Sequence, residues 1–382
     1  MNLLGIRLNL LIGPDPVALP APLPVLEALV DVEVTHGEKE ESGFRLTFAI
    51  GRSGPLDALD FQAVLNPLLQ VNARVVLTVF FDIMPRVIMD GIVTKRDLLP
   101  GDGPGQGRLV LSGHDLSIAL DREQKFAEHP AQDETTIAMK IAATYAQYLM
   151  IPMAIPPVMI DPPIPIDRTP QQTGSDWEYL QEMAARFGHV TYIEAGPAPL
   201  SNILYWGPPK RFDLQQRAIN VNLGPLTNAT DLSFGEDALT QTLVETKVKD
   251  RLTGQEMPVL TVMPTRPPLG ALPVAVKNMG KTRKSGMQTS GLNTMQAFAR
   301  AQAITDATSD EAITVSGTLD SLRYNDVLRP RAPVDLRGAG YSFDGRYMVS
   351  SVTHRIGRGG YQQEFALYRS ELGALSPLVR VV

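Results

Sequence analysis

The side chains of this chain best suited to chemistry are five histidines, and their spacing is the first thing to test. They are His36, His114, His129, His189 and His354. None has another histidine or a carboxylate at a recurring metal-ligand spacing on one face, and the chain has no cysteine. His114 and Asp115 are neighbours, but adjacent residues of a strand point to opposite faces. We therefore predict no metal site, and we interpret His354 as a partly buried structural residue.

Two glycine-containing segments have some of the residues that bind phosphate. In Gly280-Lys281-Thr282, the glycine that a P-loop needs five positions before Gly280 is replaced by Ala275. The glycine-rich residues 101–107 lead into a strand-like run instead of a helix, so no helix N-terminus is available for a pyrophosphate. We interpret both segments as loops and expect no cofactor.

Hydrolytic chemistry has equally little support in the sequence. Residues 51–54, Gly-Arg-Ser-Gly, are one residue short of a nucleophile elbow. With 41 acidic residues, a pair of carboxylates is available by chance and carries no weight. The net charge of −6 argues against a nucleic-acid surface, and we interpret the basic residues at 277–284 as solvated loop charge. We expect a protein that is not an enzyme and has no catalytic residues.

The elements that would position any site begin with strands. Phe44, Leu46, Phe48 and Ile50 alternate with polar residues, which is the period of a half-buried strand. Similar runs at 32–34, 75–81, 87–93 and 108–112 lie close together, as in a barrel or sandwich. The first eight residues predict a short edge strand without the positive region of a signal peptide, followed by a Pro-rich extended arm. No apolar run approaches the roughly 18 residues that a membrane span needs.

Helices follow at 115–120 and after Asp133, and then a Pro-rich crossing from 152 to 170, inside which we expect no regular element. The helix that begins at Ser175 has signals at both of its ends. Ser175 and Glu178 occupy the two positions of a capping box, and Gly188 can adopt the left-handed conformation that ends a helix. Its apolar face consists of Trp177, Leu180, Ala184 and Phe187.

The second half of the chain returns mostly to strands, near Tyr192 and at 203–206, 230–234 and 243–248. Residues 263–292 read as a mobile basic loop, and Asn293 with Gln296 caps an Ala-rich helix to about Ala307. A hairpin turn at Asp344-Gly345 precedes two long strands at 346–356 and 361–369. Strands that cluster instead of alternating with helices predict an α+β, β-rich fold.

These patterns divide the chain into five predicted segments. They are a first β-rich domain, a barrel or sandwich, at 1–113, a helical connector with a Pro-rich crossing at 114–190, the strands of a second β-rich body at 191–262, a basic loop and Ala-rich helix at 263–310, and the C-terminal strands that complete the β-rich bodies at 311–382.

Three stretches resemble the baseplate hub proteins of contractile tails, a family that includes the phage late control protein D group and the hub part of type VI secretion spike proteins. The first is the helix from Ser175 to Gly188 with the strand behind it, and the second is the strand-to-helix passage at 111–120. The third is the C-terminal pattern, marked by Tyr347, Val349, His354, Tyr361 and Phe365. Their order and spacing agree with the family over roughly residues 30 to 370.

The resemblance implies two tube-type β-barrels joined by α/β segments, and a homotrimeric ring that is pseudo-sixfold. Such a hub adapts a sixfold tail tube to a threefold spike. Because the fused spike of many secretion-system relatives is missing here, a separate spike protein is implied, together with a tail tube protein and other baseplate components. The particle would be assembled in the bacterial cytoplasm and become part of a virion or an injection particle. The alternatives are a distal-tail protein of a non-contractile phage and a tail-associated cell-wall hydrolase.

Overall fold

The computed structural model describes residues 2–3, 6–38, 42–50, 65–101, 106–157, 169–237, 239–250, 253–277 and 281–375. Several segments considered above lie outside them. These are Gly280, residues 51–54, most of the glycine-rich stretch at 101–107 and the central part of the Pro-rich crossing.

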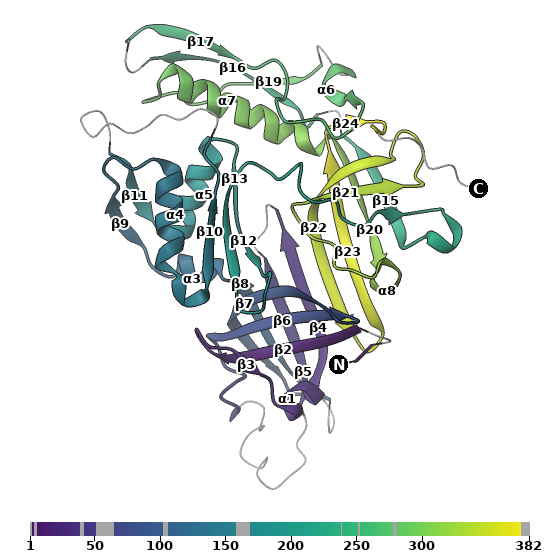
Figure 1. The fold of residues 1–382 in the computed structure, drawn as a ribbon. Coiled ribbons are helices and arrows are strands. Elements are labelled where there is room, and N and C mark those ends of the chain that lie inside the picture. The colour runs from purple at the N-terminus through teal and green to yellow at the C-terminus, as the bar shows by residue number, and fades with distance from the viewer. Residues whose placement is uncertain are drawn as a thin grey trace.

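The first third of the chain forms an antiparallel sheet, which we call the first body and which lies at the bottom of Figure 1. Phe44, Leu46, Phe48 and Ile50 are all buried in its core, so the predicted alternation is confirmed. The strands run in the order β2-β6-β7-β8-β5-β4. Their bounds are β2 Ile6–Pro14, β4 Leu29–Gly37, β5 Gly43–Ile50, β6 Ala73–Phe81, β7 Met84–Leu99 and β8 Gly107–Asp115.

The N-terminal segment agrees with the prediction only at its start. The short strand β1 (Asn2–Leu3) is the predicted edge strand, and next to it β2 pairs with β6 over nine residues. The Pro-rich stretch is not an extended arm, because β3 (Leu19–Pro20) folds back onto β2 and helix α1 (Leu23–Ala28) follows. Proline fits the first turn of a helix, where its missing N–H is not needed.

The connector packs helices against a three-stranded sheet of order β10-β13-β12. The expectation that no regular element lies between 152 and 170 is wrong at its start, because β10 includes Pro152. Strand β10 is an edge strand, where the absent N–H of a proline costs no ladder hydrogen bond. The elements are α3 Ser117–Asp121, β9 Lys125–Glu128, α4 Glu134–Thr144, η2 Ala146–Tyr148, β10 Met150–Ala154, β11 Gln171–Gly174, α5 Asp176–Arg186, β12 Val190–Ala195 and β13 Asn202–Gly207.

A second β-rich body is built from the C-terminal third and a segment before the upper helix. It contains β14 Ile219–Asn220, η3 Gly224–Leu226, β15 Ala229–Glu236, β20 Ile313–Asp320, α8 Ser321–Tyr324, β21 Pro333–Arg337, β22 Gly345–Gly357 and β23 Gly360–Arg369. Strand β22 pairs with β4 of the first body, so both bodies share one 14-stranded sheet. Among the described residues, this sheet is an open path from β1 to β15. The β-rich α+β class is thus confirmed.

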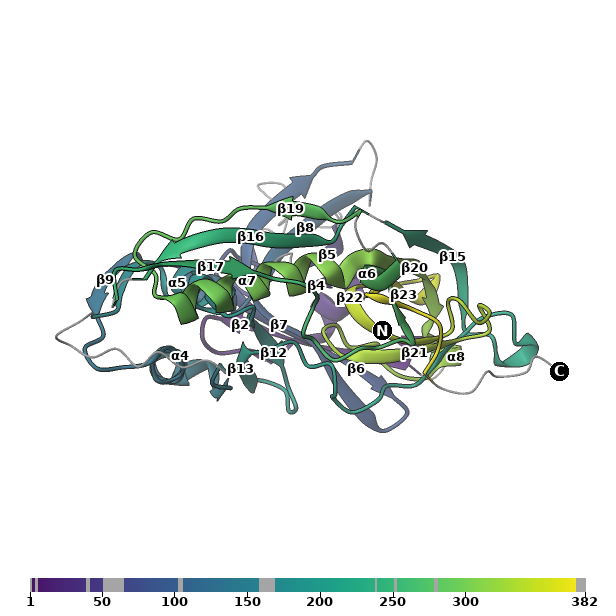
Figure 2. The ribbon, with the colours of Figure 1, turned by 90° about the horizontal axis from the view of Figure 1, so that it is seen from above.

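An upper lobe lies across the connector and the second body (Figures 1 and 2). Its long helix α7 (Thr294–Ser309) begins at the predicted cap, where Asn293 and Gln296 form a capping box. The mobile loop expected at 263–292 contains regular elements instead, because β19 (Arg283–Ser285) pairs with β16 (Thr242–Lys249). The other elements are β17 Glu256–Leu260, β18 Leu272–Pro273, α6 Val274–Lys277, η4 Asp310–Ala312 and β24 Glu371–Leu372. None of the helices described is long and apolar enough to cross a bilayer.

Candidate functional site

Helix α5 has the predicted capping at both ends. The hydroxyl oxygen of Ser175 accepts the Glu178 N–H at 3.1 Å, and the Glu178 carboxylate accepts the Ser175 N–H at 2.9 Å. Gly188 has a φ of +64°, and a Cβ added there would lie 3.0 Å from the Cβ of Ala303 on α7. Glycine at this position therefore ends α5 and also permits the close approach of the upper lobe.

The apolar face of α5 forms much of the connector core. Trp177 and Leu180 are buried there, and Phe187 packs edge-on against Trp206 with ring centroids 6.4 Å apart. The indole N–H of Trp206 donates to the carbonyl oxygen of Leu180 at 3.2 Å. These residues hold a helix against a sheet, and no polar group of theirs faces a reaction site.

The residues of the C-terminal pattern lie in different cores. Tyr347, Val349 and Phe365 are buried in the second body, whereas Tyr361 belongs to the core of the first. His354 lies between them, with its Nδ1 3.0 Å from the Tyr361 hydroxyl. Together with the α5 residues, the predicted motif residues are therefore divided among three cores. These residues pack in separate cores and do not form one common site.

His354 is fully buried, which goes beyond the partial burial expected, and it faces a second histidine. The rings of His36 and His354 meet edge-on at 6.0 Å, and Nε2 of His36 donates to the carbonyl oxygen of Ile88 at 2.6 Å. Burial lowers the pKa of His354 to about 3 and that of His36 to about 4. Both imidazoles are consequently neutral at physiological pH.

This pair predicts acid sensitivity. In the unfolded chain the histidines take up protons near pH 6.5, whereas in the folded chain the two buried imidazoles stay neutral at that pH. The stability that they contribute is therefore complete above pH 6.5 and is lost as the pH falls toward 4. At pH 4 the expected loss for His354 is about 3 kcal/mol. Urea unfolding of the His36→Gln/His354→Gln variant between pH 7 and 4 should show a flatter pH dependence than the wild type. An unchanged slope would contradict the prediction. Buried carboxylates with a raised pKa give a pH dependence of the opposite sign, and because both proteins contain them, their contribution cancels in the comparison.

A buried ion pair joins the first body to the connector. The guanidinium of Arg74 on β6 donates to Asp90 on β7 at 2.9 and 2.7 Å, and both side chains are almost fully inaccessible. Asn202, at the start of β13, donates to the same carboxylate at 2.9 Å and to the Tyr148 carbonyl at 3.1 Å. A second link runs from Arg74 to the Leu200 carbonyl at 3.2 Å. One charged pair thus fixes the position of the connector sheet on the first body.

Arg331 joins all three bodies at one point. Its backbone has a φ of +59° and is held by a hydrogen bond from its N–H to the Val349 carbonyl at 2.8 Å. Its guanidinium donates to the carbonyl oxygen of Gly37 in the first body and stacks over Tyr192 of the connector at 4.5 Å. A residue of the second body therefore contacts both the first body and the connector directly.

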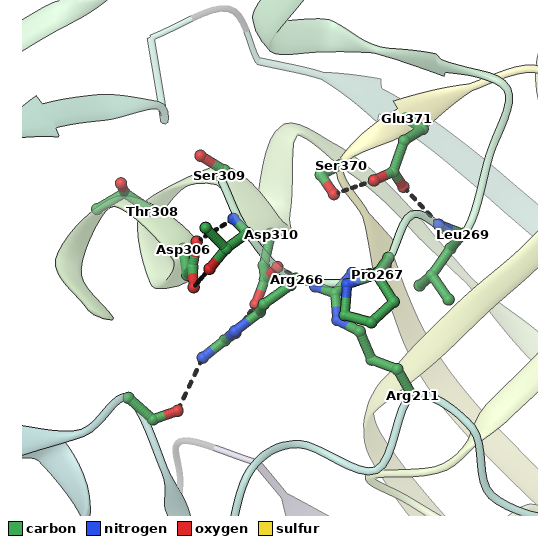
Figure 3. A network of polar contacts seen from close by, with 12 residues as sticks. Arg211, Arg266, Pro267, Leu269, Asp306, Thr308, Ser309, Asp310, Ser370 and Glu371 are labelled. Atoms are coloured by element: carbon green, nitrogen blue, oxygen red, sulfur yellow. Dashed lines mark hydrogen bonds and ion pairs between the residues drawn. The ribbon is translucent and has the colours of Figure 1, made fainter. Parts of the chain in front are cut away.

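The upper lobe is attached through the network in Figure 3. Asp310, at the end of α7, accepts hydrogen bonds from both Arg211 and Arg266, and all three side chains are largely buried. Arg211 also donates to the Pro267 carbonyl at 3.0 Å, and Arg266 to the Gly188 carbonyl behind α5 at 3.0 Å. The sequence analysis missed this network, as it missed Arg74 and Arg331. No local pattern marks an arginine whose partner is distant in sequence.

Asp310→Asn should loosen this attachment. The amide keeps the size of the carboxylate but replaces two charge-assisted hydrogen bonds, and each such bond contributes about 1.5–3 kcal/mol. We expect the free energy of unfolding to fall by about 2 kcal/mol, because the amide oxygen still accepts one of the two bonds. The substitution should increase the rate of amide hydrogen exchange more in α7 and β16 than in β4 or β5. A uniform increase over all three bodies would show that the network does not act locally.

Within the described ranges, no three His, Cys, Asp or Glu side chains are grouped in a way that could hold a metal ion. A pocket of about 340 Å³ lies at the junction between β7, β12 and residues 327–331. The junction can thus hold the parts of the chain together and accept a small group.

No family model and no curated protein matches the sequence. The structure does match solved ones. A tail protein from Neisseria meningitidis MC58 aligns over 96% of each chain, with a TM-score of 0.62 and 15% identity. The 43 kDa tail protein of prophage MuSo2 from Shewanella oneidensis aligns over 95% of this chain and 99% of its own, with a TM-score of 0.63 and 11% identity.

A third match is a component of the type VI secretion system of Escherichia coli that exhibits structural similarity to the bacteriophage T4 tail proteins gp27 and gp5. It aligns over 92% of this chain and 77% of its own, with a TM-score of 0.53 and 11% identity. At these identities the matches establish the fold. The chain has the fold of phage tail proteins and of a type VI secretion component, which confirms the resemblance found in its motifs.

Proposed function

We propose that this protein is the structural baseplate hub of a contractile phage tail or a phage-like injection system. The observation that carries the proposal is the alignment with two tail proteins, one of them from a prophage, over nearly the whole of each chain. Because the alignment covers nearly all of both chains, it supports the view that the two bodies, the connector and the upper lobe occur together in tail proteins.

The internal architecture supports a geometric role. Two β-rich bodies share one sheet through β4 and β22, and buried arginines at three places hold the remaining parts against it. A scaffold that connects parts of different symmetry needs such fixed angles between its bodies and needs no catalytic group. We propose that three copies form a pseudo-sixfold ring, with a tail tube protein on one side and a separate spike protein on the other.

Within each subunit of this ring, we propose one barrel from 1–113 and a second from 311–382 with the part of 191–262 that contains β14 and β15. The connector of 114–190 is extended by β12 and β13, and the upper lobe of 263–310 is extended by β16 and β17. The assembled ring would form in the bacterial cytoplasm, contact further baseplate components and leave the cell in a virion or injection particle.

The test is the mass of the purified protein, alone and mixed with the spike and tube proteins of its own genome. Light scattering should give three times 41.6 kDa for the ring, and the spike should co-elute with it. A monomer that binds neither component would overturn the proposal. Hydrolysis of purified cell wall that disappears on a single carboxylate substitution would instead favour an enzyme.

A further inference from the structure

The pocket at the junction has the size of a ligand site. Its volume of about 340 Å³ lies at the lower end of the ~300–1,000 Å³ typical of small-molecule pockets. Every body contributes a wall, namely residues 85–88 of β7, residues 192–195 of β12 and residues 327–331 of the second body. A ligand bound here would therefore contact all three bodies at once.

Two of the charged groups that line the pocket are already paired. Arg86 forms two hydrogen bonds with Asp326, at 2.8 and 3.1 Å. Glu194, the carboxylate of the wall, lies 3.6 Å from Lys210. The other two arginines that line the pocket are Arg329 and Arg331.

Among the described residues, Arg329 and Arg331 form no direct ion pair with a carboxylate. Arg329 donates to the Leu214 carbonyl at 3.3 Å, and Arg331 donates to the Gly37 carbonyl and, at 3.4 Å, to the Ser42 hydroxyl. Within the same part of the chain, Nε of Arg331 is buried without a hydrogen-bond partner. Burial lowers the pKa of Arg331, although the more distant carboxylates of Asp115, Glu38 and Glu194 act in the opposite direction. An anion in the pocket would add the direct partner that its guanidinium lacks.

The rest of the lining is largely apolar. It includes Ile88, Ile193, Ile203, Val327 and Leu328, and the aromatic ring of Tyr192. A phosphate or sulfate would leave these groups in contact with water, whereas a hydrocarbon body would cover them. The lining thus selects for an acid that also carries an apolar group.

We propose that this pocket binds a carboxylate attached to an apolar body, with Arg329 and Arg331 pairing with the carboxylate. Guanidinium groups match the planar geometry of a carboxylate with two parallel hydrogen bonds. Two sources share this chemistry, a small aliphatic or aromatic acid and the C-terminal residue of a polypeptide. The inference is independent of the hub proposal, because it requires neither a ring nor a spike.

Matched acid and amide probes test the proposal on the full chain. Indole-3-propionate and its amide represent the small acid, and the tripeptide Ala-Ile-Leu with a free or an amidated C-terminus represents the polypeptide. In calorimetric titrations we expect at least one acid to bind at least tenfold more tightly than its amide. The pair that shows the difference identifies the source. Equal affinities within both pairs, or no binding at millimolar concentrations, would overturn the proposal.

Two variants locate the binding. Arg329→Gln should weaken binding of the acid at least tenfold and leave the amide unchanged. Arg323→Gln is the matched control, since this exposed arginine pairs with Asp320 outside the pocket and should leave both affinities unchanged. Binding that survives Arg329→Gln would contradict the assignment. Thermal melts verify folding, and the wild-type comparison of acid and amide stands even if a variant fails to fold.

Discussion

Replacing Asp90 with alanine is expected to lower the free energy of unfolding by about 3–5 kcal/mol. The carboxylate is fully buried and accepts two hydrogen bonds from Arg74 and one from Asn202. Removing it leaves a guanidinium buried without a counter-charge, and desolvation of that charge is what makes a broken buried pair costly. Urea denaturation at pH 7 measures the change.

The control is an ion pair of similar geometry in contact with water. Arg86 and Asp326 are also bidentate, but their side chains are 46% and 27% exposed. Arg86→Ala should therefore cost about 1 kcal/mol or less. Replacing both members of the buried pair, as Arg74→Met/Asp90→Leu, should recover much of the loss. A loss for Asp90→Ala no greater than that for Arg86→Ala would show that the pair does not secure the connector.

Trp177→Ala is expected to lower the free energy of unfolding by about 3–5 kcal/mol. The indole is 8% exposed and belongs to the connector core with Leu180 and Trp206. Its ring N–H has no hydrogen-bond partner among the described residues, so the loss comes from packing and from the cavity that remains. The measurement is again urea denaturation, with near-ultraviolet circular dichroism to monitor the remaining tryptophan.

Gln181→Ala serves as the matched control on the same helix. Gln181 is exposed and alanine has the higher helix propensity, so the change should stay within about 0.5 kcal/mol. If both substitutions proved equally small, α5 would not be packed in the way the structure shows. A large loss for Trp177→Ala alone would confirm that the connector core depends on this side chain.

Both effects concern how bodies are held together. Asp90 lies between the first body and the connector, and Trp177 fills the connector core beneath the upper lobe. In the ring proposed above, the angles between these parts would determine how neighbouring subunits meet.

Local elements could be predicted from the sequence because their causes lie within a few residues of one another. The capping boxes at Ser175 and at Asn293 each use a side chain and an N–H three positions apart. The alternation from Phe44 to Ile50 follows from the period of a strand, and the two long strands predicted at 346–356 and 361–369 pair with each other. The motif resemblance was also available, since it requires only order and spacing.

The mistaken predictions share a cause. The Pro-rich segment near Pro20 and the basic residues around Arg283 have the composition of loops, but strand partners elsewhere in the chain hold them in place. Proline at an edge strand or in a first helical turn costs little, so composition alone overstates its effect. Pairing with another strand outweighed local preference in each case, since β3 pairs with the preceding strand β2 and β19 with the more distant β16.

Only the tertiary structure decided how the bodies are joined. Strand β4 pairs with β22 across more than three hundred residues of sequence, and Arg211 meets Asp310 at a separation of 99. An arginine in a sequence carries no sign of whether its charge will be solvated or buried against a carboxylate from another element. Burial and partner are properties of the packed chain, so the predictable part of this protein is its elements, and their junction, with its pocket and three arginine contacts, exists only after folding.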